Sequence, residues 1–168
     1  VDTLIASSAG NITMSGAVSG AGGIVKMDGN SLVLAGSNSY LGLTIVSNGA
    51  VQAANDNALG DSSVGSIVVG GNGTGGYSLN LAGNITVAAE PLTLEGNLVG
   101  RAYLRNSSGT NTWSGPVAVT ANSNTVGFTS DAGLMIVDGD VRGTVSNGAS
   151  FFLRGAAAGV IAGNLSVT

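Results

Sequence analysis

Glycine interrupts this chain at intervals too short for a helix of ordinary length. The 29 glycines leave no glycine-free stretch longer than residues 84–95, and Pro91 lies inside that stretch. Each interior glycine costs a helix roughly 1 kcal/mol and a proline about 3 kcal/mol. Short segments rich in β-branched residues and bounded by turn residues are typical of strands, and the clearest are 24–27, 31–34, 43–46, 66–69, 77–81 and 116–120. The chain is therefore predicted to be all-β.

Small side chains favour a solenoid over a two-sheet sandwich. Three Phe, one Trp and three Met are too few to fill a gap of about 10 Å between packed sheets. A narrow solenoid instead stacks Val, Ile, Leu and Ala on similar residues in adjacent coils. Residues 10–16 resemble 83–88 and 163–168, and residues 31–36 resemble 77–83. We therefore expect a parallel β-helix, with insertions between coils because the copies keep no single period.

Composition excludes several classes of function. Without His and Cys, the chain has no Ser-His-Asp or Cys-His nucleophilic site, no His or thiolate zinc site and no disulfide. A net charge of −4 argues against a nucleic-acid partner, which requires a basic surface. The most apolar run, 155–163, is only about half the roughly 18 residues that a membrane-spanning helix needs. We expect one β-solenoid domain over residues 1–168, with no membrane span in this chain.

Acidic residues and glycine-rich loops give no strong metal or catalytic pattern. Asp138-Gly139-Asp140 places two carboxylates close together, but this triplet is typical of a turn. Glu90 and Glu95 are five residues apart, so a strand directs them to opposite faces. The glycine-rich segment 70–76 lacks both the Asp of a calcium repeat and the Lys of a P-loop. We predict no catalytic residue, no metal ligand and no cofactor.

One segment resembles a known protein family. Residues 23–60 contain, in order, Ile24-Val25-Lys26, Leu32-Val33-Leu34-Ala35-Gly36, Asn38-Ser39-Tyr40-Leu41-Gly42, Gly49-Ala50-Val51-Gln52 and Asp56-Asn57-Ala58-Leu59-Gly60. This order resembles the autotransporter-associated β-strand repeat, also called the passenger-associated transport repeat. Residues 111–115 and 130–134 resemble the sequence between such repeats. The resemblance implies a right-handed parallel β-helix exported to the bacterial cell surface as a rod-like passenger.

Both ends of the sequence have strand character. Leu4 and Ile5 lie near the beginning, and Leu165, Ser166 and Val167 lie near the end. A solenoid that ends in an uncapped strand exposes a sheet edge, which pairs readily with another copy. These five residues are candidates for contacts between subunits stacked head to tail. Such a contact produces a filament when it does not close into a ring.

A basic and aromatic stripe is the clearest surface feature. Period-two alternation places Arg101, Tyr103 and Arg105 on one face of a strand. With Arg142, these residues are candidates for binding a surface glycan or a neighbouring subunit. The alternative is that these residues form an ordinary solvated face of the solenoid with no binding function.

The favoured function is that of a non-catalytic structural protein, an extracellular β-helix subunit that stacks into a surface rod or filament. One alternative is an excised autotransporter passenger that acts as an adhesin or glycan-binding module through Arg101, Tyr103 and Arg105. Another is a polysaccharide-cleaving β-helix enzyme, which requires acids and bases clustered on neighbouring coils. Nine acidic residues, five basic residues and no His make this enzyme the least favoured alternative.

Overall fold

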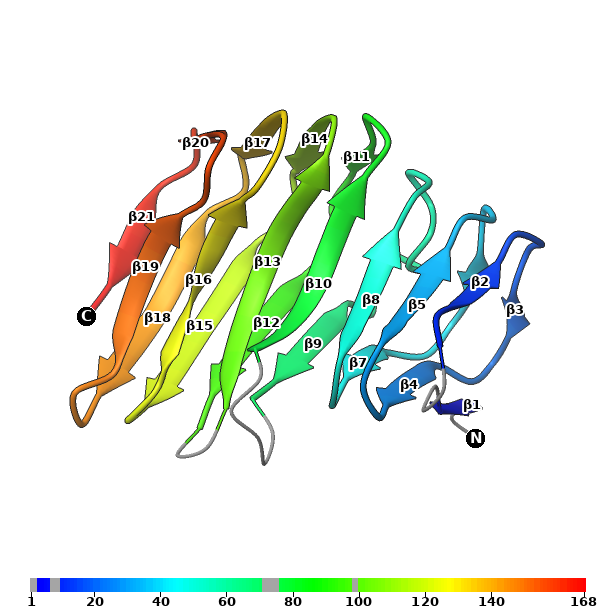
Figure 1. The fold of residues 1–168 in the computed structure, drawn as a ribbon, viewed down its shortest axis with the longest axis horizontal. Helices are drawn as coiled ribbons and strands as arrows, with labels where there is room; N and C mark the ends of the chain where they lie inside the picture. The colour runs from blue at the N-terminus through cyan, green and yellow to red at the C-terminus, as the bar shows by residue number, and fades with distance from the viewer. Residues whose placement is uncertain (1–2, 7–9, 71–75, 98–99) are drawn as a thin grey trace.

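A computed structural model shows the chain as a β-solenoid of stacked parallel strands, as predicted (Figure 1). The structure describes residues 3–6, 10–70, 76–97 and 100–168, and these contain no helix. The two ends of the chain lie at opposite ends of the stack. Every pair of strands within the sheets is parallel, because each strand lies beside the strand one coil earlier or later.

Each complete coil contributes a strand to two long sheets, and most coils add a short strand on a third face. In order of pairing, the first sheet contains β1 (Thr3–Ala6), β4 (Ile24–Met27), β7 (Thr44–Val46), β9 (Ser66–Val69), β12 (Leu92–Gly96), β15 (Val117–Asn122), β18 (Val141–Ser146) and β21 (Leu165–Val167). The second contains β2 (Ile12–Met14), β5 (Ser31–Leu34), β8 (Ala50–Ala53), β10 (Gly76–Ala82), β13 (Arg101–Ser108), β16 (Thr125–Ser130) and β19 (Ser150–Arg154). The third face contains β3 (Ser19–Gly20) with β6 (Ser39–Tyr40), and separately β11 (Thr86–Val87), β14 (Thr110–Trp113), β17 (Leu134–Val137) and β20 (Ala158–Ile161).

The core is a set of stacked inward-facing columns. In the second sheet, one column runs through Leu32, Val51, Leu79, Leu104 and Phe128, all of them buried. Because each apolar side chain packs on its counterparts in the adjacent coils, small and medium residues fill most of the interior, and only a few aromatic rings such as Trp113 and Tyr40 are needed. This arrangement explains why a chain with so few aromatic residues can form a core.

Coil length varies along the stack, as expected from the irregular spacing of the similar segments. Partners in the first sheet are 20 residues apart from Ile24 to Thr44 and 26 apart from Ser66 to Leu92. On the third face, residues 55–64 form turns between β8 and β9 and separate the two short sheets.

One set of similar segments matches the structural repeat, and the other does not. Leu32 and Leu79 share a column two coils apart, with Val51 between them. By contrast, Ile12, Thr86 and Leu165 lie on three different sheets. The resemblance among residues 10–16, 83–88 and 163–168 therefore does not reflect a common place in the coil.

The Gly-Asn pair marks a corner before a strand, whichever face that strand joins. Asn11 Oδ1 accepts a hydrogen bond from the Ser31 amide (2.9 Å), and Asn84 Oδ1 accepts one from the Thr110 amide (2.8 Å). Asn164 Nδ2 donates to Asp140 Oδ1 over 2.9 Å. Each asparagine thus connects its corner to an adjacent coil, and this shared role explains the similarity of the three segments.

Side chains within residues 23–60 hold successive coils together. The buried Asn38 accepts a hydrogen bond from the Val18 amide at Oδ1 (2.8 Å) and donates from Nδ2 to the Ala58 carbonyl (2.6 Å). Tyr40 packs so closely on Gly60 that a Cβ at Gly60 would overlap the ring. Asn38 and Tyr40, two of the residues that carry the family resemblance, therefore hold adjacent coils together.

Candidate functional site

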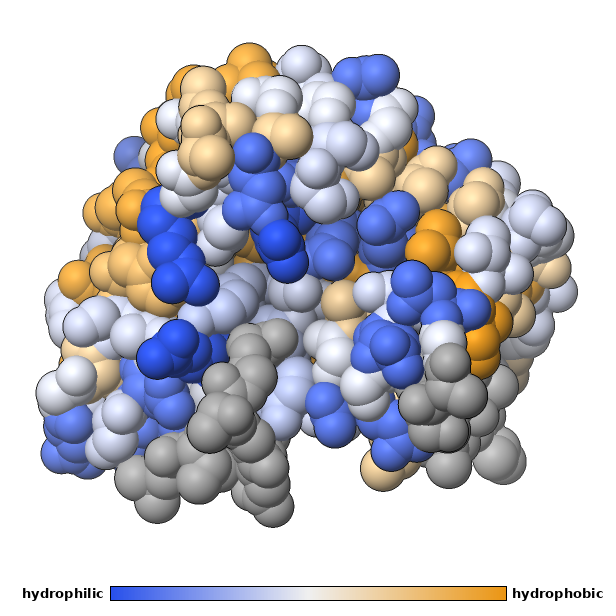
Figure 2. All heavy atoms as spheres, in the orientation of Figure 1, coloured by the Kyte–Doolittle hydropathy of each residue, from blue (hydrophilic) through white to orange (hydrophobic). Residues whose placement is uncertain are grey.

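The end of the solenoid formed by β19, β20 and β21 has unpaired sheet edges. Each of these three strands has a neighbour on only one side within the part of the chain that the structure describes. Their outer backbone groups are available for a further coil. Figure 2 shows hydrophobic residues at this end of the molecule, toward the left of the view.

Inward-facing side chains at this end remain exposed because no coil covers them. Leu153 lies in register with Phe128, yet Leu153 is 57% exposed and Phe128 is 4% exposed. Leu165 likewise pairs with the fully buried Val141 but is 49% exposed. The difference in exposed fraction between the partners of each pair shows how much surface one additional coil would bury.

These side chains surround an apolar hollow of about 500 Å³. Its lining includes Phe128, Met135, Val137, Leu153, Ile161 and Leu165. The hollow is the open end of the core, since Met135 and Val137 belong to the buried cluster. Its chemistry therefore suits further stacked apolar residues.

The predicted contact residues at this end lie on β21. Leu165, Ser166 and Val167 pair with Val141, Arg142 and Gly143 on one side. The Asn164 carbonyl and the Thr168 amide bond toward β18. Since successive residues of a strand direct their backbone groups to alternate sides, the amides of Leu165 and Val167 point toward the free edge.

The opposite end has matching open edges. β1, β2 and β3 each have a neighbour on only one side among the described residues. The predicted contact residues Leu4 and Ile5 lie on β1, opposite Val25 and Lys26. On β2, Ile12 is 36% exposed, although its partner Leu32 is buried. Both long sheets therefore end in an open edge at each end of the stack.

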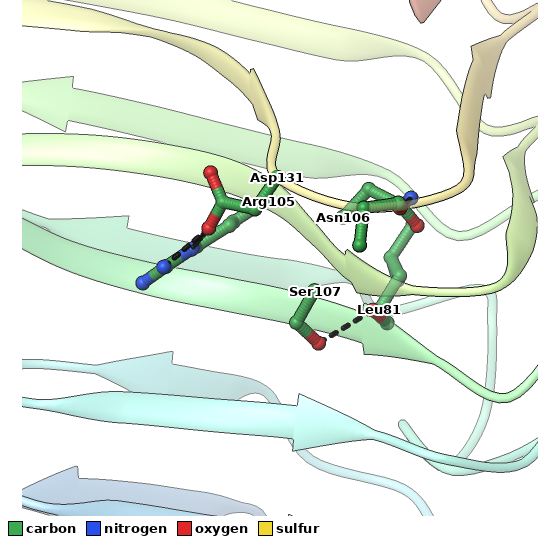
Figure 3. Close-up of polar contacts among 6 residues, drawn as sticks. Leu81, Arg105, Asn106, Ser107 and Asp131 are labelled. Atoms are coloured by element: carbon green, nitrogen blue, oxygen red, sulfur yellow. Dashed lines mark hydrogen bonds and ion pairs between the residues drawn. The ribbon is translucent and has the colours of Figure 1, made fainter. Parts of the chain in front are cut away.

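The predicted stripe of Arg101, Tyr103 and Arg105 shares the outer side of β13, opposite the buried Ala102 and Leu104. Both arginines are exposed, but the Tyr103 ring is covered by residues of β19. Arg105 forms an ion pair with Asp131 at the end of β16, and Figure 3 shows the two side chains directed toward each other. Arg101 stands at the start of β13, apart from this pair.

Two further residues on β19 join this surface, while Arg142 does not. Phe152 meets Tyr103 edge to face, with ring centroids 5.3 Å apart. The Arg154 guanidinium lies 5.1 Å from the centroid of Tyr103 and 4.6 Å from that of Phe152.

Arg142 lies on β18 of the first sheet and pairs with Asp140 over 2.8 Å. The extension of the stripe to Arg142 was therefore wrong, because alternation within one strand gives no information about which sheet another strand joins.

A buried polar cluster was not predicted from the sequence. Glu90 and Ser66 lie inside the solenoid, where Ser66 Oγ donates to Glu90 Oε1 over 2.9 Å. Nearby, the Tyr40 hydroxyl and Thr44 Oγ1 are 2.5 Å apart. Burial raises the pKa of Glu90 to about 7 and raises the pKa of Tyr40 as well. Alternation cannot place Glu90 inside, because it precedes Pro91 at a corner rather than within a strand.

Lys26 is a second buried charged group. Its inward direction can be read from the alternation of residues along its strand. Its Nζ donates to the carbonyl oxygens of Met27 (2.5 Å), Asp28 (2.7 Å) and Gly29 (3.1 Å). Burial lowers the pKa of Lys26, while the nearby Asp28 raises it. Alternation along β4 places Lys26 on the same inward side as Ile24. Lys26 thus satisfies the carbonyls of a corner.

Asp138-Gly139-Asp140 forms the corner between β17 and β18, as expected for a turn. Among the described residues, no group of three or more acidic side chains could hold a metal ion. Most of the glycine-rich segment 70–76 lies outside the described residues.

No family model, curated protein or solved structure matches this chain. The described residues form no helix of the length and apolar character needed to cross a membrane. The sites described above are therefore interpreted from their own geometry.

Proposed function

We propose that this chain is a non-catalytic structural protein whose solenoid stacks end to end into an extracellular rod or filament. The observation that carries the proposal is the match between the two open ends. The inner column of the second sheet begins at Ile12 and ends at Leu153, and both residues are exposed. A second copy that continues this column places its Ile12 against Leu153.

The first sheet supports the same arrangement. Its register runs from Thr3 through Ile24 and onward to Val141 and Leu165 without leaving the column. If the next copy continues this register, its Thr3 lies beside Leu165 and its Leu4 beside Ser166. The two long sheets then continue together across the junction.

Apolar burial and backbone pairing supply the driving force for this contact. Full burial of a leucine side chain contributes about 1.5–3 kcal/mol, and Leu153 and Leu165 retain about half of their surface for this purpose. New ladder hydrogen bonds would satisfy the outward amides of Leu165 and Val167. The contact is heterologous, so repeated stacking produces a rod rather than a closed dimer.

The family resemblance supports an extracellular, bacterial surface location. The residues that carry it include Asn38 and Tyr40, which contact adjacent coils, and Lys26, whose Nζ binds the carbonyl oxygens of the corner after β4. Corners of this kind suit a rod because they fix the stacking of one coil on the next. A rod-like passenger displayed on the cell surface needs no catalytic residue.

Electron microscopy of the purified protein at rising concentration tests the proposal. Eight strands in the first sheet, at about 4.8 Å each, give an axial repeat of about 38 Å per subunit. We expect unbranched rods that lengthen with concentration. Particles that remain one subunit long at every concentration would contradict the proposal.

Val167→Pro provides a directed variant for the same experiment. Proline removes the amide that points to the free edge but leaves the β18 side of the ladder intact. Val167→Ala is the matched control, because it also shortens the side chain while keeping the amide. We expect shorter rods for the proline variant alone, with folded monomers in both cases by circular dichroism.

A further inference from the structure

A polar cleft lies on the outer side of the second sheet. Its hollow of about 380 Å³ is lined by Ser78, Tyr103, Arg105, Thr129, Asp131 and Arg154, together with Gly155. Ser78 lies on β10, Tyr103 and Arg105 on β13, Thr129 on β16 and Arg154 on β19. Figure 2 shows strongly hydrophilic residues gathered over this part of the face.

The strand register explains why a hollow forms here. Arg105, Thr129 and Arg154 occupy one outward column, so the short threonine lies between two long arginines. In the next column Gly127 lies between Tyr103 and Phe152. Because Gly127 has no side chain, the two aromatic rings meet across it.

The cleft contains polar groups without partners. The Tyr103 hydroxyl and Thr129 Oγ1 have no hydrogen-bond partner among the described residues, although the two side chains are only 6% and 7% exposed. A buried hydroxyl without a partner costs free energy that a ligand oxygen can recover. These hydroxyls lie beneath the exposed arginines, not on a solvated surface.

Arg154 is the second unusual group of the cleft. Its guanidinium rests on the rings of Tyr103 and Phe152 and forms no ion pair with any described acidic residue. Arg105, by contrast, is neutralised by Asp131. The cleft therefore combines one guanidinium without a carboxylate partner, two hydroxyl groups without partners and one ion pair.

We propose that this cleft binds an acidic saccharide, a sugar ring that carries a carboxylate. A carboxylate accepts two parallel hydrogen bonds from a guanidinium, which is the group that Arg154 offers. Sugar hydroxyls both donate and accept, so they suit Thr129, Ser78 and the Arg105–Asp131 pair. When the carboxylate draws Arg154 away from the ring beneath it, the Tyr103 hydroxyl becomes available to the same ligand.

The charge distribution supports an anionic ligand. Three of the five basic residues of this acidic chain, Arg101, Arg105 and Arg154, lie on β13 and β19 of this sheet. Of the other two, Lys26 is buried and Arg142 is paired on the first sheet. A local excess of positive charge attracts anions even on a protein of net negative charge.

A glycan array followed by titration calorimetry tests the proposal with the intact chain. The array carries oligosaccharides ending in glucuronate, galacturonate or sialic acid, with neutral oligosaccharides of equal length beside them. We expect binding to at least one acidic class and weaker binding at high salt. Absence of any preference for acidic over neutral saccharides would overturn the proposal. Equally tight binding of inorganic phosphate would also overturn it, because the cleft would then be a general anion site.

Three variants assign the binding to this cleft. Tyr103→Phe removes only the unpaired hydroxyl, so we expect an affinity loss of about tenfold or more with no loss of thermal stability. Arg154→Gln should abolish binding, while Arg142→Gln on the other sheet leaves it unchanged. Unchanged affinity in both Tyr103→Phe and Arg154→Gln would contradict the assignment. Rod formation is measured separately for each variant, because Arg154 and Gly155 line both this cleft and the apolar hollow at the end of the stack.

Discussion

Ser66 and Glu90 are joined by a buried hydrogen bond between adjacent coils, from Ser66 Oγ to Glu90 Oε1 over 2.9 Å. Ser66 begins β9, and Glu90 lies at the corner that leads into β12. Burial is the main cause that raises the pKa of Glu90 to about 7; the Ser66 hydrogen bond opposes it, and the charge of Asp61 adds to it. Burial also raises the pKa of Tyr40, and the charge of Glu90 adds to that shift.

The solenoid should therefore be more stable in mild acid than above neutral pH. In the unfolded chain the Glu90 carboxyl has its usual pKa of 4.5, and in the folded chain about 7. Between these values the folded state holds a proton that the unfolded state has lost, so stability falls as the pH rises. The full loss above pH 7 is about 3 kcal/mol. Urea unfolding between pH 4.5 and 8 measures it, and the absence of His removes imidazole titration from this window.

Glu90→Gln provides the control for that titration. The amide keeps a polar partner for Ser66 but does not ionise, so the pH dependence between 4.5 and 7 should flatten. At pH 8 the variant should be more stable than the original chain. An unchanged slope in the variant would show that another group is responsible.

Asn38→Ala should destabilise the domain by about 2–3 kcal/mol. The change leaves the Val18 amide and the Ala58 carbonyl without the partner that Asn38 provides, and a buried polar group without a partner costs about 1–3 kcal/mol. Asn57→Ala is the matched control in the same corner, because Asn57 is exposed and its bond to Ser37 is long at 3.4 Å. Equal free energies of unfolding for the two variants would refute the role of Asn38.

Gly127→Ala should destabilise the domain by about 1–3 kcal/mol, as expected for overpacking. A Cβ at this position would overlap the Phe152 carbonyl oxygen, so β19 or the Tyr103–Phe152 ring pair must shift. Gly159→Ala is the control, since the nearest atom to its added Cβ is 3.8 Å away. Thermal unfolding compares the two variants, and similar midpoints would mean that the close approach at Gly127 is readily relieved.

Much of the fold could be predicted because short sequence patterns determine where the strands begin and end. Strands 24–27, 31–34 and 66–69 have the predicted boundaries, since β-branched residues and flanking turns define them directly. The alternation along β13 also placed Arg101, Tyr103 and Arg105 on one side correctly. Short-range periodicity is sufficient for these features.

Features that depend on neighbouring coils could not be predicted in the same way. The burial of Tyr103 depends on Phe152 and Arg154, which are one strand beyond its immediate neighbour in the sheet. Glu90 is buried at the corner before β12, where its partner is Ser66 of the preceding coil. Variable coil lengths hide the register in the sequence, so contacts between distant strands become visible only in the folded chain.

The central claim is that β21 of one copy pairs with β1 of the next, and cysteine cross-linking tests it most directly. The chain contains no cysteine, so Leu4→Cys and Ser166→Cys introduce the only two thiols. Continued register places these positions side by side at about 4.8 Å, where a disulfide can form. Thr13→Cys with Ser166→Cys is the control, because Thr13 lies on the second sheet. We predict a ladder of covalent oligomers under oxidising conditions for the first pair alone. Monomers only, or equal cross-linking in the control, would contradict end-to-end stacking.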